Sequence, residues 1–370
     1  MKLKITSLVA IGLGAFASFA GAQTPVIDIT GSTAGRSAVH ASILNVLDGE
    51  TYAFAGSATA AKATSAIYKG KLGGSTGPNV IIRTYWSGSV NGVRDVGEQL
   101  AQTKLLATSE ALNPTSVAGT YTTSPSYAAS SETDSKPEIG FSDVFASSTG
   151  YTVPVETSVA VIPFKWFKSA DASANLTNMT PGLFQALYGS LGELSLALFT
   201  GNSADEGSIV YALGRNSDSG TRITTLAEAG FGVFNGVSQY TATYGSGNMT
   251  LSATTGNTGF SSGSDMKGAL LCNCSSGSVV GYVGASDWLG VPTQELTWNG
   301  VAYSTDNLFN GKYTFWGYLH MNSITLSGTS STFFTSLSTD IKNSTTSGIE
   351  KITSMRVERQ GDGAPVTPLY

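Results

Sequence analysis

Three short segments rich in glycine and hydroxyl side chains have the residue types that bind a small anion. They are Ser32-Thr33-Ala34, Gly88-Ser89 and Ser219-Gly220-Thr221. Each follows an apolar stretch typical of a strand and precedes a helical pattern, so we expect each at the start of a helix. The first turn of a helix has unpaired backbone N–H groups and the positive end of the helix dipole, which together favour anions. The segments therefore predict an anion-binding site.

Arg215 places a fixed positive charge four residues before Ser219. The guanidinium group is forked, and its paired donors suit a tetrahedral oxyanion. Each segment alone also fits an ordinary helix cap or turn, and chance pairs of glycine and serine are common in a chain with 44 glycines. Only the order of the segments along the chain favours a shared site.

The elements that must position these segments alternate along the chain. Strand patterns cover 26–30, 80–85, 138–141, 155–164, 209–213 and 279–284. Helical patterns cover 37–47, 93–106, 183–189, 221–229 and 333–341. This alternation predicts an α/β fold with a largely parallel sheet. In such folds ligands bind beyond the carboxyl ends of the strands, where the three segments lie.

Taken in order, these segments resemble the phosphate-specific substrate-binding proteins of ABC transporters, which belong to the two-lobed periplasmic-binding-protein class (type II). The matching stretches are 31–34, 88–92, 139–143 and 215–221, followed by 280–283 and 313–318. The stretch from Arg215 to Thr221 is the most specific of them. The resemblance implies an α/β fold of two lobes with mixed, mostly parallel sheets and a ligand cleft between the lobes.

The same resemblance implies a set of phosphate-binding residues: Thr33, Ala34, Ser89, Asp143, Arg215, Ser219, Gly220 and Thr221. Within this set Asp143 would accept a hydrogen bond from a protonated phosphate oxygen. Fully ionised sulfate has no proton to donate, so this carboxylate would favour phosphate over sulfate. The alternative for Asp143 is a solvated aspartate in a turn.

The chain also departs from the family pattern. The spacing from Ser89 to Asp143 is longer than in compact relatives, and so is the spacing from Thr33 to Ser89. The acidic residue usually found two positions before the serine is replaced by Ser217, and Asp218 follows one place later. These departures leave the identity of the oxyanion open.

The sequence predicts an N-terminal signal peptide followed by two lobes. Two lysines, an apolar stretch and the small residues of Ala20-Gly21-Ala22 predict a signal peptide over residues 1–22. No cysteine follows it to carry a lipid, so we expect a periplasmic or secreted protein. One lobe should comprise 23–157 and 284–370, with an insertion at about 112–136, and the other lobe 158–283.

Composition excludes several functions. The chain has 370 residues, 12% charged residues and a formal charge of −5, so it has no basic surface for nucleic acid. Two histidines and two cysteines cannot supply a multi-ligand metal centre, and we expect neither metal nor cofactor. Cys272 and Cys274 flank a single asparagine, which leaves a strained disulfide and two free thiols as equal alternatives.

The sequence therefore predicts an exported, monomeric solute-binding protein without catalytic residues. Its ligand would be inorganic phosphate or a similar tetrahedral oxyanion, and its partner a membrane permease of an ABC transporter. A secreted surface or structural protein rich in serine, threonine and glycine is the alternative. A secreted phosphatase with Ser89 or Ser219 as nucleophile is a weaker one, because neither serine has a histidine base nearby in the sequence.

Overall fold

The computed structural model describes residues 23–57, 59–102, 104–107, 135–256 and 258–369. The predicted signal peptide and nearly all of the predicted insertion at 112–136 lie outside the described residues. Within the described part, no helix has the length and apolar character needed to cross a membrane.

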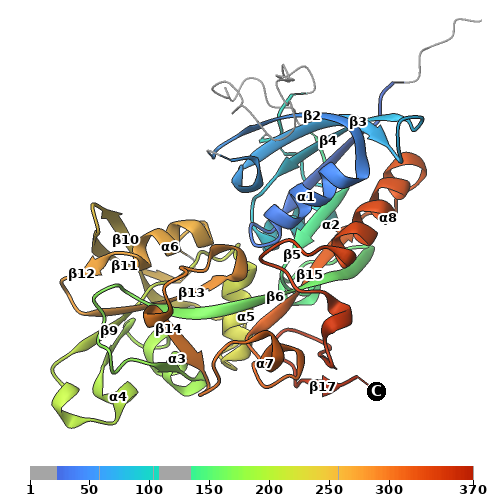
Figure 1. Ribbon diagram of the computed structural model, residues 1–370. Helices are drawn as coiled ribbons and strands as arrows, with labels where there is room; N and C mark the ends of the chain where they lie inside the picture. The colour runs from blue at the N-terminus through green and yellow to red at the C-terminus, as the bar shows by residue number, and fades with distance from the viewer. Residues whose placement is uncertain (1–22, 58, 103, 108–134, 257, 370) are drawn as a thin grey trace, which may run out of the picture.

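A twelve-stranded sheet runs through the molecule in the order β2-β3-β4-β1-β5-β15-β6-β13-β9-β8, with β14 paired to β6 and β7 (Figure 1). Its strands are β1 (Val26–Gly31), β2 (Leu47–Ala55), β3 (Ser65–Leu72), β4 (Asn79–Tyr85), β5 (Ile139–Ser142), β6 (Val155–Lys168), β7 (Asn178–Met179), β8 (Glu193–Ser195), β9 (Ile209–Ala212), β13 (Ser278–Gly284), β14 (Glu295–Trp298) and β15 (Trp316–Ser323). Two smaller sheets contain β10 (Val237–Gly245), β11 (Asn248–Gly256), β12 (Asn273–Cys274), β16 (Val357–Glu358) and β17 (Thr367–Pro368).

The helices pack on the sheets in two groups (Figure 1). They are α1 (Arg36–Val46), α2 (Ser89–Gly97), α3 (Pro181–Tyr188), α4 (Ala197–Thr200), α5 (Gly220–Glu228), α6 (Gly263–Leu270), α7 (Thr305–Phe309) and α8 (Gly328–Asn343). The first lobe contains β1 to β5 with α1, α2 and α8, and the second contains β8 to β13 with α3, α4, α5 and α6. The long antiparallel strands β6 and β15 connect the lobes.

This arrangement confirms the two-lobed α/β fold. The sheet is mixed: β1 runs parallel to β4 and β5, β13 runs parallel to β9, and most other neighbours are antiparallel. The parallel strands are the ones whose ends carry the predicted site. Because β6 and β15 belong to one continuous sheet, the exact residue boundaries of the lobes stay a prediction.

An aromatic cluster around Trp166 fixes the second lobe to the connecting strands. The Trp166 ring lies 5.2 Å from Tyr282 and 6.1 Å from Phe315, measured between ring centroids, and all three side chains are buried. The Tyr282 hydroxyl accepts a hydrogen bond from the Arg215 backbone N–H at 3.4 Å. Core packing therefore reaches directly to the loop that carries the candidate arginine.

Two sequence predictions are corrected or decided here. The helix expected over 93–106 begins at Ser89 and ends at Gly97, because Gly88 adopts a φ of 106° and turns the chain into the helix at once. Cys272 and Cys274 are buried free thiols and form no disulfide.

Candidate functional site

Two strand ends of the first lobe bring Ser89 and Asp143 together. Ser89 is the first residue of α2, just beyond β4, and Asp143 follows the last residue of β5. The Ser89 hydroxyl donates to Oδ1 of Asp143, and the Asp143 backbone N–H lies 3.3 Å from the Ser89 Oγ. Both side chains are buried. The sheet thus unites two residues that are 54 positions apart.

The second lobe contributes the N-terminus of α5 to the same point. Thr221 Oγ1 donates to Asp143 Oδ2 at 3.2 Å, and a Cβ added at Gly220 would overlap Oδ1 of the same carboxylate. The Ser219 hydroxyl caps the helix by accepting from the Arg222 backbone N–H at 3.2 Å. The carboxylate of Asp143 therefore lies against the first turn of α5, where an anion is favoured by the helix dipole.

Arg215, in the loop that precedes α5, supplies a buried positive charge near this cluster. Its side chain is buried, and its guanidinium donates to the carbonyl oxygens of Phe260 at 3.1 Å and Ser261 at 3.2 Å. Burial lowers the pKa of Arg215, while the charges of Tyr282 and Asp143 act in the opposite direction. The same interior raises the pKa of Asp143 through loss of water, against hydrogen bonds from Ser89 and the attraction of Arg215.

Thr33 and Ala34 occupy a different position from the other predicted residues. The Ala34 backbone N–H donates to the Ser32 hydroxyl at 3.1 Å, so its hydrogen bond is local. Thr33 lines a neighbouring cavity of about 480 Å³ together with Asn216, which follows Arg215. We call this space the interlobe cavity. Of the eight predicted residues, the structure thus brings Ser89, Gly220 and Thr221 against the carboxylate of Asp143. Ser219 caps α5 beside them, Arg215 lies in the preceding loop, Thr33 lines the adjoining cavity and Ala34 keeps a local hydrogen bond.

Sequence reasoning missed Arg36 and Lys62, which also line the interlobe cavity. Arg36 is the first residue of α1 and directly follows the first glycine-rich segment, so a basic residue at a helix start was the available clue. Lys62 lies in a 3-10 turn whose sequence carries no such pattern.

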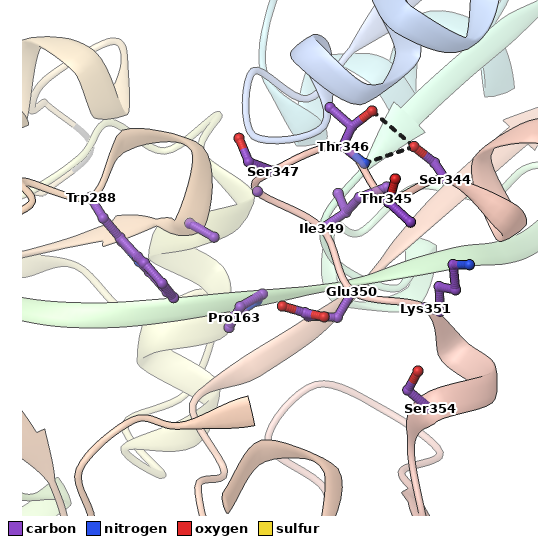
Figure 2. Close-up of a pocket in the computed structure, with 12 residues that line it drawn as sticks. Pro163, Trp288, Ser344, Thr345, Thr346, Ser347, Ile349, Glu350, Lys351 and Ser354 are labelled. Carbon is purple, nitrogen blue, oxygen red and sulfur yellow. Dashed lines mark hydrogen bonds between the residues drawn. The ribbon is translucent and has the colours of Figure 1, made fainter. Parts of the chain in front are cut away.

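A second cavity of about 470 Å³ lies where the segment 344–351 passes Pro163 of β6 and Trp288 (Figure 2). Thr346 bonds the Ser344 hydroxyl through both its backbone N–H, at 3.1 Å, and its side chain, at 2.9 Å. None of the eight predicted residues lines this cavity. It lies at the strands that connect the lobes and is separate from the Asp143 cluster.

The histidines are engaged away from the candidate serines. His40 Nδ1 bonds the Tyr68 hydroxyl at 2.8 Å, and His320 lies 3.3 Å from Glu156. Burial lowers the pKa of His40 to about 4 and that of His320 to about 3, so both are neutral at pH 7. Among the described residues no group of three or more metal-ligating side chains is assembled.

No protein-family model matches this sequence, and no curated protein does so either. Solved structures are similar over most of the chain. One is a putative phosphate ABC transporter substrate-binding protein with bound phosphate from Clostridium perfringens, with 13% identity, a TM-score of 0.47, and coverage of 88% of this chain and 99% of that chain.

Two further solved structures are similar. An ABC-type phosphate transport receptor from Vibrio cholerae has 11% identity and a TM-score of 0.45, over 85% of this chain and 93% of that chain. A possible phosphate binding protein from Planctomyces limnophilus has 12% identity and a TM-score of 0.41, over 81% and 82% of the two chains. These structures belong to the class that the sequence resembles. At such identities the function must be argued from the side chains themselves.

Proposed function

We propose that this chain is an exported solute-binding protein that captures inorganic phosphate, or a similar tetrahedral oxyanion, between its lobes. It would act as a monomer without enzymatic activity and deliver the ion to the membrane permease of an ABC transporter. The observation that carries the proposal is the cluster in which Asp143 meets Ser89 of one lobe and the α5 N-terminus of the other, beside the buried Arg215.

The cluster has the donors that an oxyanion needs. The hydroxyls of Ser89 and Thr221 already donate to the two carboxylate oxygens of Asp143 at the positive end of α5. Parting of the lobes separates Asp143 from Thr221, so Thr221 and the α5 N-terminus become free to bind an incoming oxyanion, while Ser89 and Asp143 stay together on the first lobe. Arg215 then supplies the charge that balances the anion in a site removed from water.

Asp143 gives the site its selectivity for phosphate. A carboxylate facing an unprotonated oxyanion opposes two acceptors with no hydrogen between them, and an unmade hydrogen bond to a buried charged group costs more than about 1–3 kcal/mol. Phosphate at pH 7 retains a proton that it can donate to Asp143, whereas sulfate does not. Inorganic phosphate therefore satisfies every group in the cluster.

Titration calorimetry with phosphate and sulfate tests this proposal. In the wild-type protein phosphate should bind at least about tenfold more tightly than sulfate, since about 1.4 kcal/mol corresponds to tenfold. Asp143→Asn supplies a donor and should narrow this ratio by improving sulfate binding. Asp306→Asn, at the exposed start of α7, is the matched control and should leave the ratio unchanged.

Three results would contradict the proposal. Equal affinity for both ions, unaltered in Asp143→Asn, would remove the selectivity argument. Absence of any rise in melting temperature with phosphate would favour a structural surface protein, because a ligand that binds the folded form must stabilise it. Turnover of a chromogenic phosphate ester, lost in Ser89→Ala or Ser219→Ala, would identify a phosphatase.

A further inference from the structure

The interlobe cavity adjoins the oxyanion cluster and is much larger than a single phosphate ion. Its volume of about 480 Å³ falls in the range of about 300–1,000 Å³ that is typical of sites for organic ligands. It is continuous with the arginine loop, because Asn216 and Ser261 line it and the Ser261 carbonyl accepts from Arg215 at 3.2 Å. A ligand whose phosphate lies beside Arg215 can therefore extend into this space.

Arg36 presents an incompletely paired guanidinium group to the cavity. The residue is only 7% exposed, and its Nη1 donates to the Ala63 carbonyl at 3.2 Å. Its Nε is buried and has no hydrogen-bond partner. A buried donor without a partner is costly, and Nε itself is covered by the protein, so a ligand oxygen in the cavity gains this hydrogen bond only when the Arg36 side chain turns toward it.

The charges around the cavity are balanced, which argues against a second anionic group. Lys62 Nζ pairs with Asp287 Oδ1 at 3.0 Å, and Asp287 also accepts from the Ser264 hydroxyl at 2.8 Å. Arg36 faces the negative charges of Asp287 and Asp265, both of which raise its pKa against the effect of burial. A neutral group that donates to Asp265 and accepts from Arg36 would satisfy both sides.

The remaining lining fits a hydroxylated ligand. Hydroxyl side chains that can both donate and accept line the cavity from both lobes, and they include Thr33, Ser57, Thr64, Ser87, Ser261 and Ser262. Partly exposed Tyr85 adds aromatic surface beside them, whereas Trp86 is only 5% exposed and supports the wall of the cavity from within the core. Ring faces of this kind pack against the C–H groups of a polyol.

We propose that the ligand is a phosphate monoester of a small polyol, of the sugar-phosphate class. This inference rests on the proposed function: the phosphate binds at the α5 N-terminus and Arg215, and the polyol occupies the interlobe cavity between Arg36 and Asp265. The ester still has terminal oxygens for Ser89 and Thr221. Its second ionisation lies near pH 6, so a protonated form remains available to Asp143 near neutral pH.

Titration calorimetry at pH 6.5 with five compounds tests this inference. Glucose 6-phosphate should bind at least about tenfold more tightly than inorganic phosphate or methyl phosphate, which lack the polyol. Glucose alone should show no measurable binding, because it lacks the anion. Tighter binding of pyrophosphate than of glucose 6-phosphate would overturn the proposal in favour of a second anionic group.

A cavity-filling variant separates the two parts of the ligand. Thr64→Trp adds bulk at an exposed position that lines the cavity. It should weaken the binding of glucose 6-phosphate at least about tenfold and leave the affinity for inorganic phosphate unchanged. Thr243→Trp, at an exposed position of β10, is the control and should change neither affinity. Arg36→Lys should weaken the binding of glucose 6-phosphate and leave the affinity for inorganic phosphate unchanged. The melting temperature of this variant verifies that it folds.

The outcomes distinguish this inference from the proposed function. If inorganic phosphate binds as tightly as glucose 6-phosphate and Thr64→Trp affects neither, the polyol site is refuted and the phosphate site stands. If neither compound binds, the phosphate site itself is refuted and this inference falls with it.

Discussion

At the scale of single residues, the molecule keeps several carboxylates in places where water is excluded. Asp143 is buried between two lobes, and Asp362, partly exposed as a residue, has its carboxyl oxygen Oδ1 covered beneath the loop that follows β5. The Phe145 backbone N–H donates to Asp362 Oδ2 at 2.9 Å, but Oδ1 has no hydrogen-bond partner. Burial raises the pKa of Asp362 to about 7, against hydrogen bonds from Ser148 and Phe145 and the charge of Arg359.

This carboxyl group makes stability depend on pH. Its pKa in the folded chain exceeds the usual value of 3.8, so the folded state holds a proton that the unfolded state releases between about pH 4 and 7. The contribution of Asp362 to the free energy of unfolding should therefore fall as pH rises through this window, by about 1.4 kcal/mol for each unit of pKa shift. Buried His40 and His320 contribute a rise in the same range, because the unfolded chain binds protons that their lowered pKa values exclude from the folded chain. Asp362→Asn removes only the falling contribution, so it should gain stability relative to the wild type from pH 5 to pH 8, and urea unfolding at the two pH values measures this difference.

Asp143 contributes a fall of the same sign, because burial raises its pKa as well. Adding Asp143→Asn to Asp362→Asn should therefore increase the gain in stability relative to the wild type between pH 5 and pH 8. A difference in stability between Asp362→Asn and the wild type that stays constant from pH 5 to pH 8 would show that Asp362 is hydrated and ionised.

At the scale of elements, α5 requires a glycine at its first position. A side chain at Gly220 would overlap the Asp143 carboxylate and the Ser89 hydroxyl, both of which belong to the opposite lobe. Gly220→Ala should therefore hold the lobes apart and weaken phosphate binding by at least about tenfold. The helix itself should tolerate alanine, which is favoured over glycine in helices by about 0.5–1 kcal/mol.

Gly182 in the first turn of α3 is the matched control for this variant. A Cβ there would lie 4.0 Å from its nearest neighbour, the Thr180 hydroxyl, so Gly182→Ala should leave phosphate affinity unchanged. Calorimetry gives the affinities, and melting temperatures verify that both variants fold. Full affinity in Gly220→Ala would mean that the ligand binds without contact between Asp143 and α5.

The elements also show which parts of the fold were predictable from the sequence. Helix α3 follows the predicted pattern, with the Thr180 hydroxyl accepting from the Leu183 backbone N–H at 3.2 Å. The hairpin of β2 and β3 was missed because a register shift between Asp48 and Thr51 interrupts the alternation of apolar residues. Local periodicity thus predicts regular elements and fails at bulges.

The candidate site was predictable only in part, for a related reason. Ser89, Asp143 and the stretch 219–221 each stand at the end of a strand, and the parallel strands bring such ends together. Arg36 and Lys62 lie near residues of the stretch 261–287, which is distant in the sequence. No local sequence pattern predicts a contact between segments so far apart. Their participation follows only from the folded chain.

At the scale of the whole molecule, the lobes are connected by β6 and β15 and touch again across the cleft (Figure 1). Besides Asp143 and Thr221, the Val90 backbone N–H donates to the Asp218 carbonyl at 3.2 Å. Lys62 of the first lobe binds the Ser286 carbonyl at 2.9 Å and Asp287 at 3.0 Å. Asp287 also accepts from Ser264 of α6 in the second lobe at 2.8 Å, so it links Lys62 to that lobe. These contacts exist only when the lobes are together, so they stabilise the closed arrangement and are lost when the lobes separate.

Lys62→Ala should therefore speed the release of phosphate. The lysine side chain of the pair is 34% exposed and the aspartate side chain 8%, so loss of the pair should cost about 0.2–1 kcal/mol. Such a loss corresponds to an increase of up to about fivefold in the dissociation rate, because changes in affinity arise mainly from dissociation. Stopped-flow tryptophan fluorescence measures this rate.

Lys71→Ala is the control, since Lys71 binds the Ser75 carbonyl within its own hairpin. Identical release rates in the two variants would show that the Lys62 bridge plays no part in closure.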